Sequence, residues 1–270
     1  MVKRVAAMND ISGLGHCSLS ALMAVLPAMG IQCCPLPTCV LSSQTDGYEG
    51  FSFCDLTPNL SDYLRHWETL GEKFDGIFTG YLGNPSQLSY AQILLKKFKK
   101  ENGIALVDPV MGDDGALYSG MPETMCESMR ALLSCADVIT PNLTEACLLT
   151  GREFRDYSVC ELAGIARELS ALGPERVLIS GIFNENTVSM LCLDKGEASY
   201  IERPKINASY PGSGDVFAGV LLGKILKGAD LKKAAEESAD FVSLCLEGCI
   251  KESAPRREGL VFEPFLSALQ

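Results

Sequence analysis

The stretch YPGSGDVFAG at residues 210–219 combines residue types that can bind a phosphate group. The residues that follow it are apolar at helical spacing, so a helix should begin here, with Gly212, Ser213 and Gly214 supplying its first unpaired N–H groups. Glycines let an anion approach the backbone closely, and the helix dipole favours negative charge at this end. The pattern therefore predicts a helix N-terminus that binds phosphate.

Asp215 lies in the first turn of this expected helix and has two interpretations. It can simply complement the helix dipole, and short Gly-x-Gly patterns are common in proteins that bind no phosphate. Alternatively, its carboxylate accepts a proton from a substrate hydroxyl while the neighbouring amides stabilise a phosphoryl group during transfer. The residues of this stretch alone leave both interpretations open.

Oxygen-bearing side chains also follow two apolar runs of strand length, which end near residues 107 and 139. They are Asp108, Asp113, Asp114, Asn142 and Glu145. Such hard oxygen ligands suit Mg²⁺, which usually binds one or two carboxylates together with a substrate phosphate. Turn formation, or helix capping by Asn142 or Thr144, explains each segment taken singly. The recurrence of acids after successive strands favours a shared site.

These side chains need a scaffold, and the chain alternates strand-like with helix-like segments. The strand-like runs are mostly continuously apolar, as strands covered on both faces require. They are residues 2–8, 31–41, 76–82, 104–110, 138–141, 177–181 and 187–193. Segments of helical period lie between several of these runs, at residues 18–29, 89–100 and 159–172. The alternation predicts an α/β fold with a mostly parallel central sheet and helices on both faces.

Ligands of such sheets bind beyond the carboxyl ends of the strands, which is where the acids stand. No linker, charge block or internal repeat divides the chain, so residues 1–270 are expected to form one domain. Residues 44–62 are rich in polar and turn residues with little helical period. We expect them to form a flap over the site.

Composition limits the class of protein. The formal net charge of −11, without a basic run, disfavours binding to nucleic acid or to anionic membranes. No segment is apolar for long enough to span a bilayer, and the first residues do not form a signal peptide. The 12 cysteines are spread through apolar segments without a C-x-x-C pair, which indicates reduced thiols and a cytoplasmic protein.

The other phosphate-binding motifs that we considered are absent or incomplete in this sequence. The chain contains no G-x-x-x-x-G-K-[ST] sequence and no protein-kinase signature. Gly13-Leu14-Gly15 begins a dinucleotide-like pattern, but Ser18 stands where the third glycine belongs, and no acid follows the next strand. Phosphate binding is therefore expected at the 212–215 motif.

Three motifs, in their order and separation, resemble the ribokinase-like superfamily. They are DPVMGDDGALY at 108–118, TPNLTEA at 140–146 and GSGD at 212–215. Within the superfamily the chain is similar to the pyridoxal kinase branch, with further support from residues 15–16, 43–45 and 80–83. The resemblance covers nearly the whole chain. It implies a three-layer α/β sandwich, usually a homodimer, that transfers the γ-phosphoryl of ATP to the 5′-hydroxymethyl group of a vitamin B6 vitamer.

The resemblance also implies roles for individual residues. Asp215 would be the catalytic base, and the amides of Gly212, Ser213 and Gly214 would form the anion hole. The residues implied near the nucleotide and Mg²⁺ are Asp108, Asp113, Tyr118, Asn142, Glu145 and Ser180, with Glu145 and Asp108 nearest the metal. Those implied around the substrate ring are Asp10, Ser12, Thr45 and Tyr81. Many members of the superfamily also need a monovalent cation.

One residue departs from the pyridoxal kinase pattern. Many pyridoxal kinases have serine where Asp10 stands, whereas related hydroxymethylpyrimidine kinases have aspartate in that stretch. Asp10 would bind a ring nitrogen or hydroxyl, or Ser12 would take over that contact. A hydroxymethylpyrimidine (phosphate) kinase is therefore an alternative, and a non-catalytic protein that binds B6 or a nucleotide is a second one.

Overall fold

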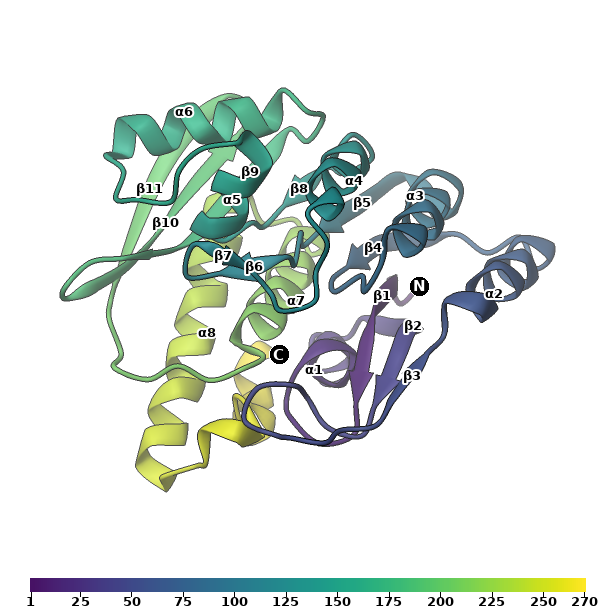
Figure 1. Ribbon diagram of the computed structural model, residues 1–270, viewed down its shortest axis with the longest axis horizontal. Coiled ribbons are helices and arrows are strands. Elements are labelled where there is room, and N and C mark those ends of the chain that lie inside the picture. The colour runs from purple at the N-terminus through teal and green to yellow at the C-terminus, as the bar shows by residue number, and fades with distance from the viewer.

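Eleven strands are present in the computed structural model, which describes residues 1–270 (Figure 1). Their bounds are β1 Arg4–Ser12, β2 Gln32–Leu41, β3 Phe53–Asp55, β4 Phe74–Thr79, β5 Lys99–Val107, β6 Gly112–Asp113, β7 Ala116–Leu117, β8 Val138–Ile139, β9 Arg176–Phe183, β10 Thr187–Asp194 and β11 Glu197–Pro204. Nine of them form one sheet in the order β11-β10-β9-β8-β5-β4-β1-β2-β3. β6 and β7 form a separate two-stranded hairpin.

The neighbouring strands β9, β8, β5, β4, β1 and β2 are parallel to one another. Antiparallel strands flank them, β10 and β11 at one edge and β3 at the other. All the carboxyl ends of the parallel strands therefore lie at one edge of the sheet, where the loops after β1, β4, β5 and β8 meet. This arrangement confirms the predicted α/β class with a mostly parallel central sheet.

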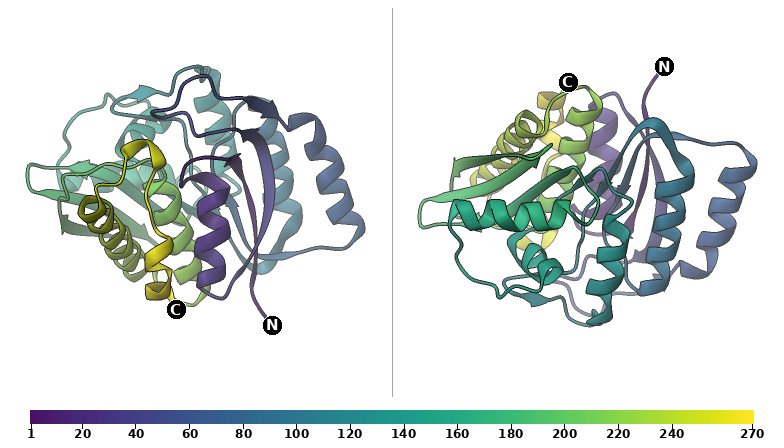
Figure 2. Two further views of the ribbon diagram at one scale, coloured as in Figure 1. Left: turned by 90° about the horizontal axis from the view of Figure 1, so that it is seen from below. Right: turned by 90° about the horizontal axis from the view of Figure 1, so that it is seen from above.

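Helices cover both faces of the sheet (Figure 2). Their bounds are α1 Ser18–Ala28, α2 Thr57–Thr69, α3 Pro85–Phe98, α4 Thr124–Leu133, α5 Leu143–Thr150, α6 Val159–Ser170, α7 Ser213–Leu226 and α8 Leu231–Glu252, followed by the short 3-10 helices η1 Arg256–Glu258 and η2 Glu263–Leu269. α1, α7 and α8 lie on one face, and α2 to α6 lie on the other (Figures 1 and 2). None of these helices is long and apolar enough to cross a membrane.

Two apolar clusters, one on each face, explain why the central strands read as continuous apolar runs. In β1, Ala6 and Met8 belong to the cluster under α2 to α6, whereas Val5 and Ala7 belong to the cluster under α1, α7 and α8. All four residues are fully buried. A strand of this kind presents alternate side chains to two cores, so its residues 5–8 are all apolar.

The segment expected as a flap is shorter than predicted. Residues 53–55 add an edge strand to β2, and α2 starts at Thr57 with a proline in its first turn. Leu60 and Leu64, one helical turn apart, bury the inner face of α2. Only residues 42–52 remain as a loop.

Candidate active site

The GSGD motif begins α7, as predicted. Gly212 is the residue before the helix, with φ of 84°, and a β-carbon at this position would collide with the carbonyl oxygen of His16. The N–H groups of Gly212, Gly214 and Asp215 have no acceptor in the protein, whereas that of Ser213 makes a long turn bond of 3.4 Å to Tyr210. Three donors at a helix N-terminus are therefore available to an anion. The sequence had assigned Ser213 rather than Asp215 to this set.

Asp215 keeps part of its surface accessible, although the protein surrounds its carboxylate closely enough to change its chemistry. The pKa of Asp215 is raised from 3.8 to about 6: burial has the largest effect, the negative charge of Asp10 also raises it, and the Ser18 amide and Asn9 side chain lower it. A carboxylate of this kind is ionised at neutral pH and is a stronger base than an ordinary aspartate.

Asn9 connects Asp215 to the loop after β4. Its side-chain nitrogen donates to Asp215 Oδ1 at 3.1 Å, and its oxygen accepts from the amides of Tyr81 at 2.7 Å and Asp10 at 3.0 Å. Asn9 is fully buried. A β-carbon at Gly80 would lie 2.5 Å from the Asn9 nitrogen, so glycine at 80 leaves the space that the Asn9 side chain occupies.

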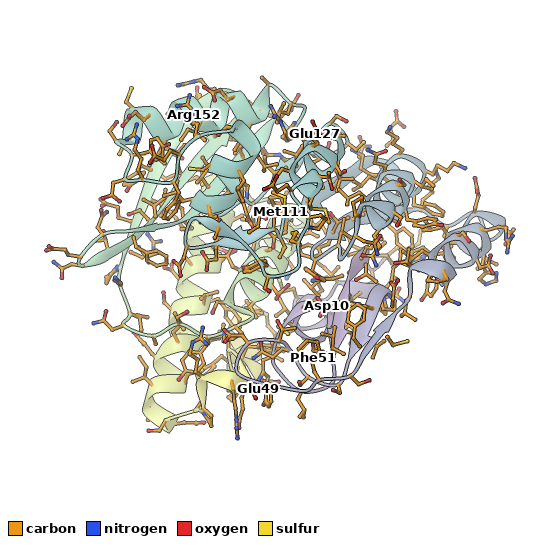
Figure 3. The ribbon with its side chains drawn as sticks, in the orientation of Figure 1. Asp10, Glu49, Phe51, Met111, Glu127 and Arg152 are labelled. Atoms are coloured by element: carbon orange, nitrogen blue, oxygen red, sulfur yellow. The ribbon has the colours of Figure 1, made fainter.

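Asp10 lies at the carboxyl end of β1 near the centre of the molecule (Figure 3). Burial raises its pKa, and hydrogen bonds from Ser18 and Ser12 lower it. Ser12 Oγ is 3.4 Å from Asp10 Oδ2, and both residues are buried. Tyr81 lies close enough that the charge of Asp10 raises the pKa of its hydroxyl, after the larger effect of burial. Three of the four predicted substrate residues therefore cluster.

The fourth, Thr45, does not join this cluster. It is exposed in the loop after β2, whereas its neighbours Ser43 and Gln44 are buried. Its predicted contact with the substrate remains a prediction.

Asp108 follows β5 and has one carboxylate oxygen in use. Thr140 donates a hydrogen bond to Oδ1 at 2.9 Å, and Oδ2 accepts none from the protein. The pKa of Asp108 is raised to about 7: burial has the largest effect, the charge of Asp215 also raises it, and the Thr140 bond lowers it. Asp108 and Asp215 are thus close enough to influence each other.

Glu145 and Asn142 have structural tasks at the start of α5. Glu145 accepts from the amides of Asn142 at 2.9 Å and Met111 at 3.0 Å, one with each oxygen. Asn142 accepts from the Glu145 amide and donates to the carbonyl of Gly112 at 2.8 Å. This reciprocal cap fixes the hairpin against the helix. Burial raises the pKa of Glu145 well above its usual range, and Asp108 adds to that shift.

The remaining residues predicted near the nucleotide lie around this hairpin. Asp113 and Tyr118 are exposed, yet Tyr118 is near the acids: burial first, and then the charges of Glu145, Asp113, Asp108 and Asp215, raise the pKa of its hydroxyl. Ser180 lies within β9 and pairs with Asn142 through an isolated parallel bridge. Their roles toward a nucleotide stay predictions.

No cationic side chain balances the acids of this site. The four carboxylates are those of Asp10, Asp108, Glu145 and Asp215. None of them takes part in a salt bridge, and the protein has no group of three or more His, Cys, Asp or Glu side chains arranged to hold a metal by themselves. The protein therefore supplies no positive charge beside these acids, and burial raises their pKa values.

Two residues that hold the acids were not predicted from the sequence. Ser18 begins α1 with φ of 54°, which is unusual for a residue other than glycine. Its amide acts on Asp215 and its hydroxyl on Asp10. Asn9 is the other. Asn9 directly follows the apolar run at 2–8, and β1 continues through it to Ser12, so its side chain is buried and needs partners.

Comparison with known proteins defines the class. A model of the family described as phosphomethylpyrimidine kinase matches residues 19–256, and the chain belongs to that family. It is a phosphotransferase that acts on a hydroxyl group. The structural matches described next confirm the predicted three-layer fold and the resemblance to the ribokinase-like superfamily.

Three solved structures illustrate the likeness. A candidate phosphomethylpyrimidine kinase from Bacteroides thetaiotaomicron, described in a form with pyridoxal, is 36% identical; the match covers 100% of this chain and 96% of that one, with a TM-score of 0.95. Pyridoxal kinase from Lactobacillus plantarum is 29% identical, over 100% and 97% of the chains, with a TM-score of 0.93. Pyridoxal kinase from Leishmania donovani, described in complex with ADP and pyridoxine, shares the fold at 22% identity, over 99% and 95%, with a TM-score of 0.88.

Proposed function

We propose that this kinase transfers the γ-phosphoryl group of ATP to the 5′-hydroxymethyl group of a vitamin B6 vitamer: pyridoxal, pyridoxine or pyridoxamine. The observation that carries the proposal is the position of Asp215, a partly accessible carboxylate beside unpaired helix N–H groups and linked through Asn9 to the backbone amides of Asp10 and Tyr81. The B6 assignment is supported by the two relatives above that are described as binding pyridoxal or as pyridoxal kinase. Its place would be in B6 salvage.

Asp215 would act as the general base. It accepts the proton of the substrate hydroxyl as that oxygen bonds to the γ-phosphorus, while the bond between the γ-phosphorus and the β–γ bridging oxygen breaks and ADP leaves. The transition state of such transfers is loose, so positioning and charge neutralisation supply most of the rate enhancement. The amides of Gly212, Gly214 and Asp215 would stabilise the charge on the phosphoryl oxygens.

Mg²⁺ fits the nucleotide end of the site. Asp108 offers a carboxylate oxygen without a protein partner, and one or two carboxylates are the usual protein share of a magnesium site that is completed by phosphates and water. Asp108 would bind the ion directly. Both Glu145 oxygens already accept backbone N–H groups, so Glu145 would not bind the ion but would orient the water molecules bound to it. The ion, when bound with ATP, supplies positive charge that the protein lacks here. A monovalent cation and a homodimer are further proposals, which rest on the resemblance.

Asp10 would determine the specificity for the substrate ring. A buried acid without a cationic partner favours a ligand group that donates a hydrogen bond or carries positive charge. A protonated pyridine nitrogen, a ring hydroxyl or an exocyclic amine meets this need, and Ser12 and Tyr81 lie near the Asp10 carboxylate. Thr45 would reach the ring from the loop after β2.

The alternative substrate is hydroxymethylpyrimidine or its phosphate. Asp10 favours it, since related hydroxymethylpyrimidine kinases have aspartate in that stretch, and the amino group of the pyrimidine is a hydrogen-bond donor. The family description points the same way. A non-catalytic binding protein is disfavoured, because a binder has no use for a base beside the anion hole.

A side-by-side assay separates these functions. ADP release is measured with ATP and Mg²⁺ in the presence of pyridoxal, pyridoxine, pyridoxamine, hydroxymethylpyrimidine and its phosphate, each at several concentrations. We expect the highest kcat/KM with a B6 vitamer. A higher value with a pyrimidine would make the alternative correct, and release with none of the alcohols, despite ligand binding, would favour the non-catalytic protein.

A further inference from the structure

The C-terminal segment, residues 254–263, contacts three loops of the site although it carries none of the predicted catalytic or binding residues. These are the β1–α1 loop at 13–17, the flap loop at 42–52 and the anion-hole loop at 210–214. Figure 1 shows the flap loop running toward the yellow C-terminal part of the chain, and Figure 3 labels Glu49 and Phe51 of that loop.

Its first contact is with the anion-hole loop. The amide of Leu260 donates to the carbonyl of Pro211 at 2.9 Å, and the hydroxyl of Tyr210 donates to the carbonyl of Ala254 at 2.9 Å. These two bonds hold the chain immediately before Gly212, so they set where the unpaired N–H groups of α7 point.

Its second contact is with the β1–α1 loop, through His16. The His16 amide donates to the carbonyl of Glu258 at 3.0 Å, and ring atom Nδ1 lies 2.6 Å from the same oxygen. Ring atom Nε2 lies 3.1 Å from the carboxylate of Glu263. Since the His16 carbonyl is packed directly against Gly212, the same histidine links the C-terminal segment to the anion hole from a second side.

Its third contact is with the flap loop. Gln44 donates from its side-chain nitrogen to the carbonyl of Arg257 at 2.6 Å and is only 6% exposed, although glutamine is seldom buried without a structural reason. Arg256 pairs with Asp46 at 2.8 Å. The Gln44 amide also donates to the carbonyl of Leu14 at 2.8 Å, which joins the flap to the β1–α1 loop.

Gly259 is the point where the anion-hole and β1–α1 contacts meet. Its backbone has φ of 84° and ψ of −175°, a conformation that is essentially restricted to glycine. A β-carbon there would lie 2.9 Å from the His16 amide nitrogen and 3.0 Å from the Pro211 carbonyl oxygen. Only glycine therefore lets the two loops approach the segment this closely.

We propose that the C-terminal segment is a clamp that assembles the two ends of the site together, with Gln44 and Gly259 as its positioning residues. Both the flap loop at the substrate end and the anion-hole loop at the phosphate end are hydrogen-bonded to the clamp. A change that increases the mobility of the flap loop should therefore also increase the mobility of the anion-hole loop. The kinetic part of this inference rests on the proposed function. The structural coupling does not.

The coupling is tested by hydrogen exchange of the full-length protein with Gln44→Met, which keeps the side-chain length and removes the donor. Loss of one buried hydrogen bond should speed exchange by about threefold to tenfold. We expect this increase in peptides that cover 44–52 and also in those that cover 210–216, which contain no contact to Gln44. An increase confined to the flap, or no increase in either region, overturns the clamp.

Gly259→Ala tests the positioning role, with Gly228→Ala as its matched control. Gly228 also has positive φ, at 101°, but a β-carbon there meets no atom within 4 Å. We expect Gly259→Ala to lower kcat by roughly 10- to 100-fold, because small misplacements of reacting groups have effects of this size, and to leave the KM for ATP within about threefold. Equal kcat in the two variants contradicts the proposal.

Tyr210→Phe serves if Gly259→Ala does not fold, since it removes one hydroxyl contact and leaves the ring in place. It should lower kcat and speed exchange at 210–216, with the KM for the alcohol unchanged, and a normal kcat with normal exchange would count against the clamp. If the unaltered protein phosphorylates no alcohol, the proposed function fails, while the exchange of Gln44→Met still decides the coupling.

Discussion

Asn9 and Asp215 are 206 positions apart in the chain and share a hydrogen bond of 3.1 Å inside the protein. The other end of the Asn9 amide accepts from the backbone of Tyr81 and Asp10. A single buried side chain therefore fixes the predicted base relative to the predicted substrate pocket. An amide suits this position because it donates to a carboxylate with one atom and accepts from backbone N–H groups with the other.

Asn9→Asp should shift the pH dependence of the reaction. The aspartate can still accept from the two amides, but it replaces the donor to Asp215 with a second carboxylate, and a like charge at this distance raises the pKa of its neighbour. Unaltered protein should lose kcat/KM as the pH falls through about 6, where Asp215 becomes protonated. In Asn9→Asp this acid limb should move up by roughly one pH unit.

The measurement is kcat/KM from pH 5 to 9 for the unaltered protein, Asn9→Asp and Asn9→Ser. The serine variant removes the contact without adding charge, so it should lower activity with a much smaller shift of the limb. An unchanged limb in Asn9→Asp would mean that Asn9 supports the fold and does not tune the base.

Much of the fold follows from local pattern, and the site follows only in part. Seven of the eleven strands and the GSGD helix start were predictable because periodicity and glycine placement act over a few residues, whereas β3, β6, β7 and β11 were not predicted. The start of α3 was not: we expected residue 89, but Asn84 caps the helix through the amides of Ser86 and Gln87, so it begins at Pro85.

Long-range contacts explain the rest. The sequence offers no means of pairing Asn9 with Asp215, or Gln44 with Arg257, because these partners meet only after the sheet has formed. α8, of 22 residues, was not among the predicted helices; it buries Cys245 and Cys249, four residues apart, on its inner face. Periodicity identifies elements, whereas partners across the sheet depend on topology.

Asp215→Asn should lower kcat by about 10²- to 10⁴-fold, the usual contribution of a general base, with the KM for ATP changed by less than about threefold. Asp230→Asn is the control. Asp230 caps α8 through the amide of Lys233, so it tests the loss of an acid at a helix start without a role in catalysis. Steady-state kinetics of both variants decide the point: near-normal turnover of Asp215→Asn would leave Asp215 as a helix-dipole partner only.

The same substitution should stabilise the protein at alkaline pH. The pKa of Asp215 is about 6 in the folded state against 3.8 ordinarily, so the folded state holds its proton more tightly than the unfolded state between these values. As the pH rises through that window, ionisation therefore lowers the free energy of unfolding. The amide introduced by Asp215→Asn does not ionise, and its oxygen keeps an acceptor for the Asn9 side chain.

Thermal unfolding without ligands, at pH 8 and at pH 4, measures this effect. Asp215→Asn should raise Tm by a few degrees at pH 8, corresponding to about 1 to 3 kcal/mol, and the gain should vanish at pH 4. A gain of equal size at both pH values would assign it to packing instead of ionisation.

Glu145→Gln should separate the capping role of this residue from its proposed action on Mg²⁺. A glutamine has one oxygen, so its NH₂ group would face one of the two backbone donors that Glu145 now satisfies, from Asn142 and Met111. The unsatisfied contact should destabilise the protein by about 1 to 3 kcal/mol. If Glu145 also orients the waters of the ion, the Mg²⁺ concentration for half-maximal activity should rise several-fold, since partners behind the metal ligands affect metal affinity. Glu161→Gln is the matched control, because Glu161 completes the same reciprocal cap with Ser158 at the start of α6. The Mg²⁺ dependence of Glu161→Gln should match that of the unaltered protein. An unchanged Mg²⁺ requirement in Glu145→Gln, together with the lower Tm, would restrict Glu145 to the helix cap.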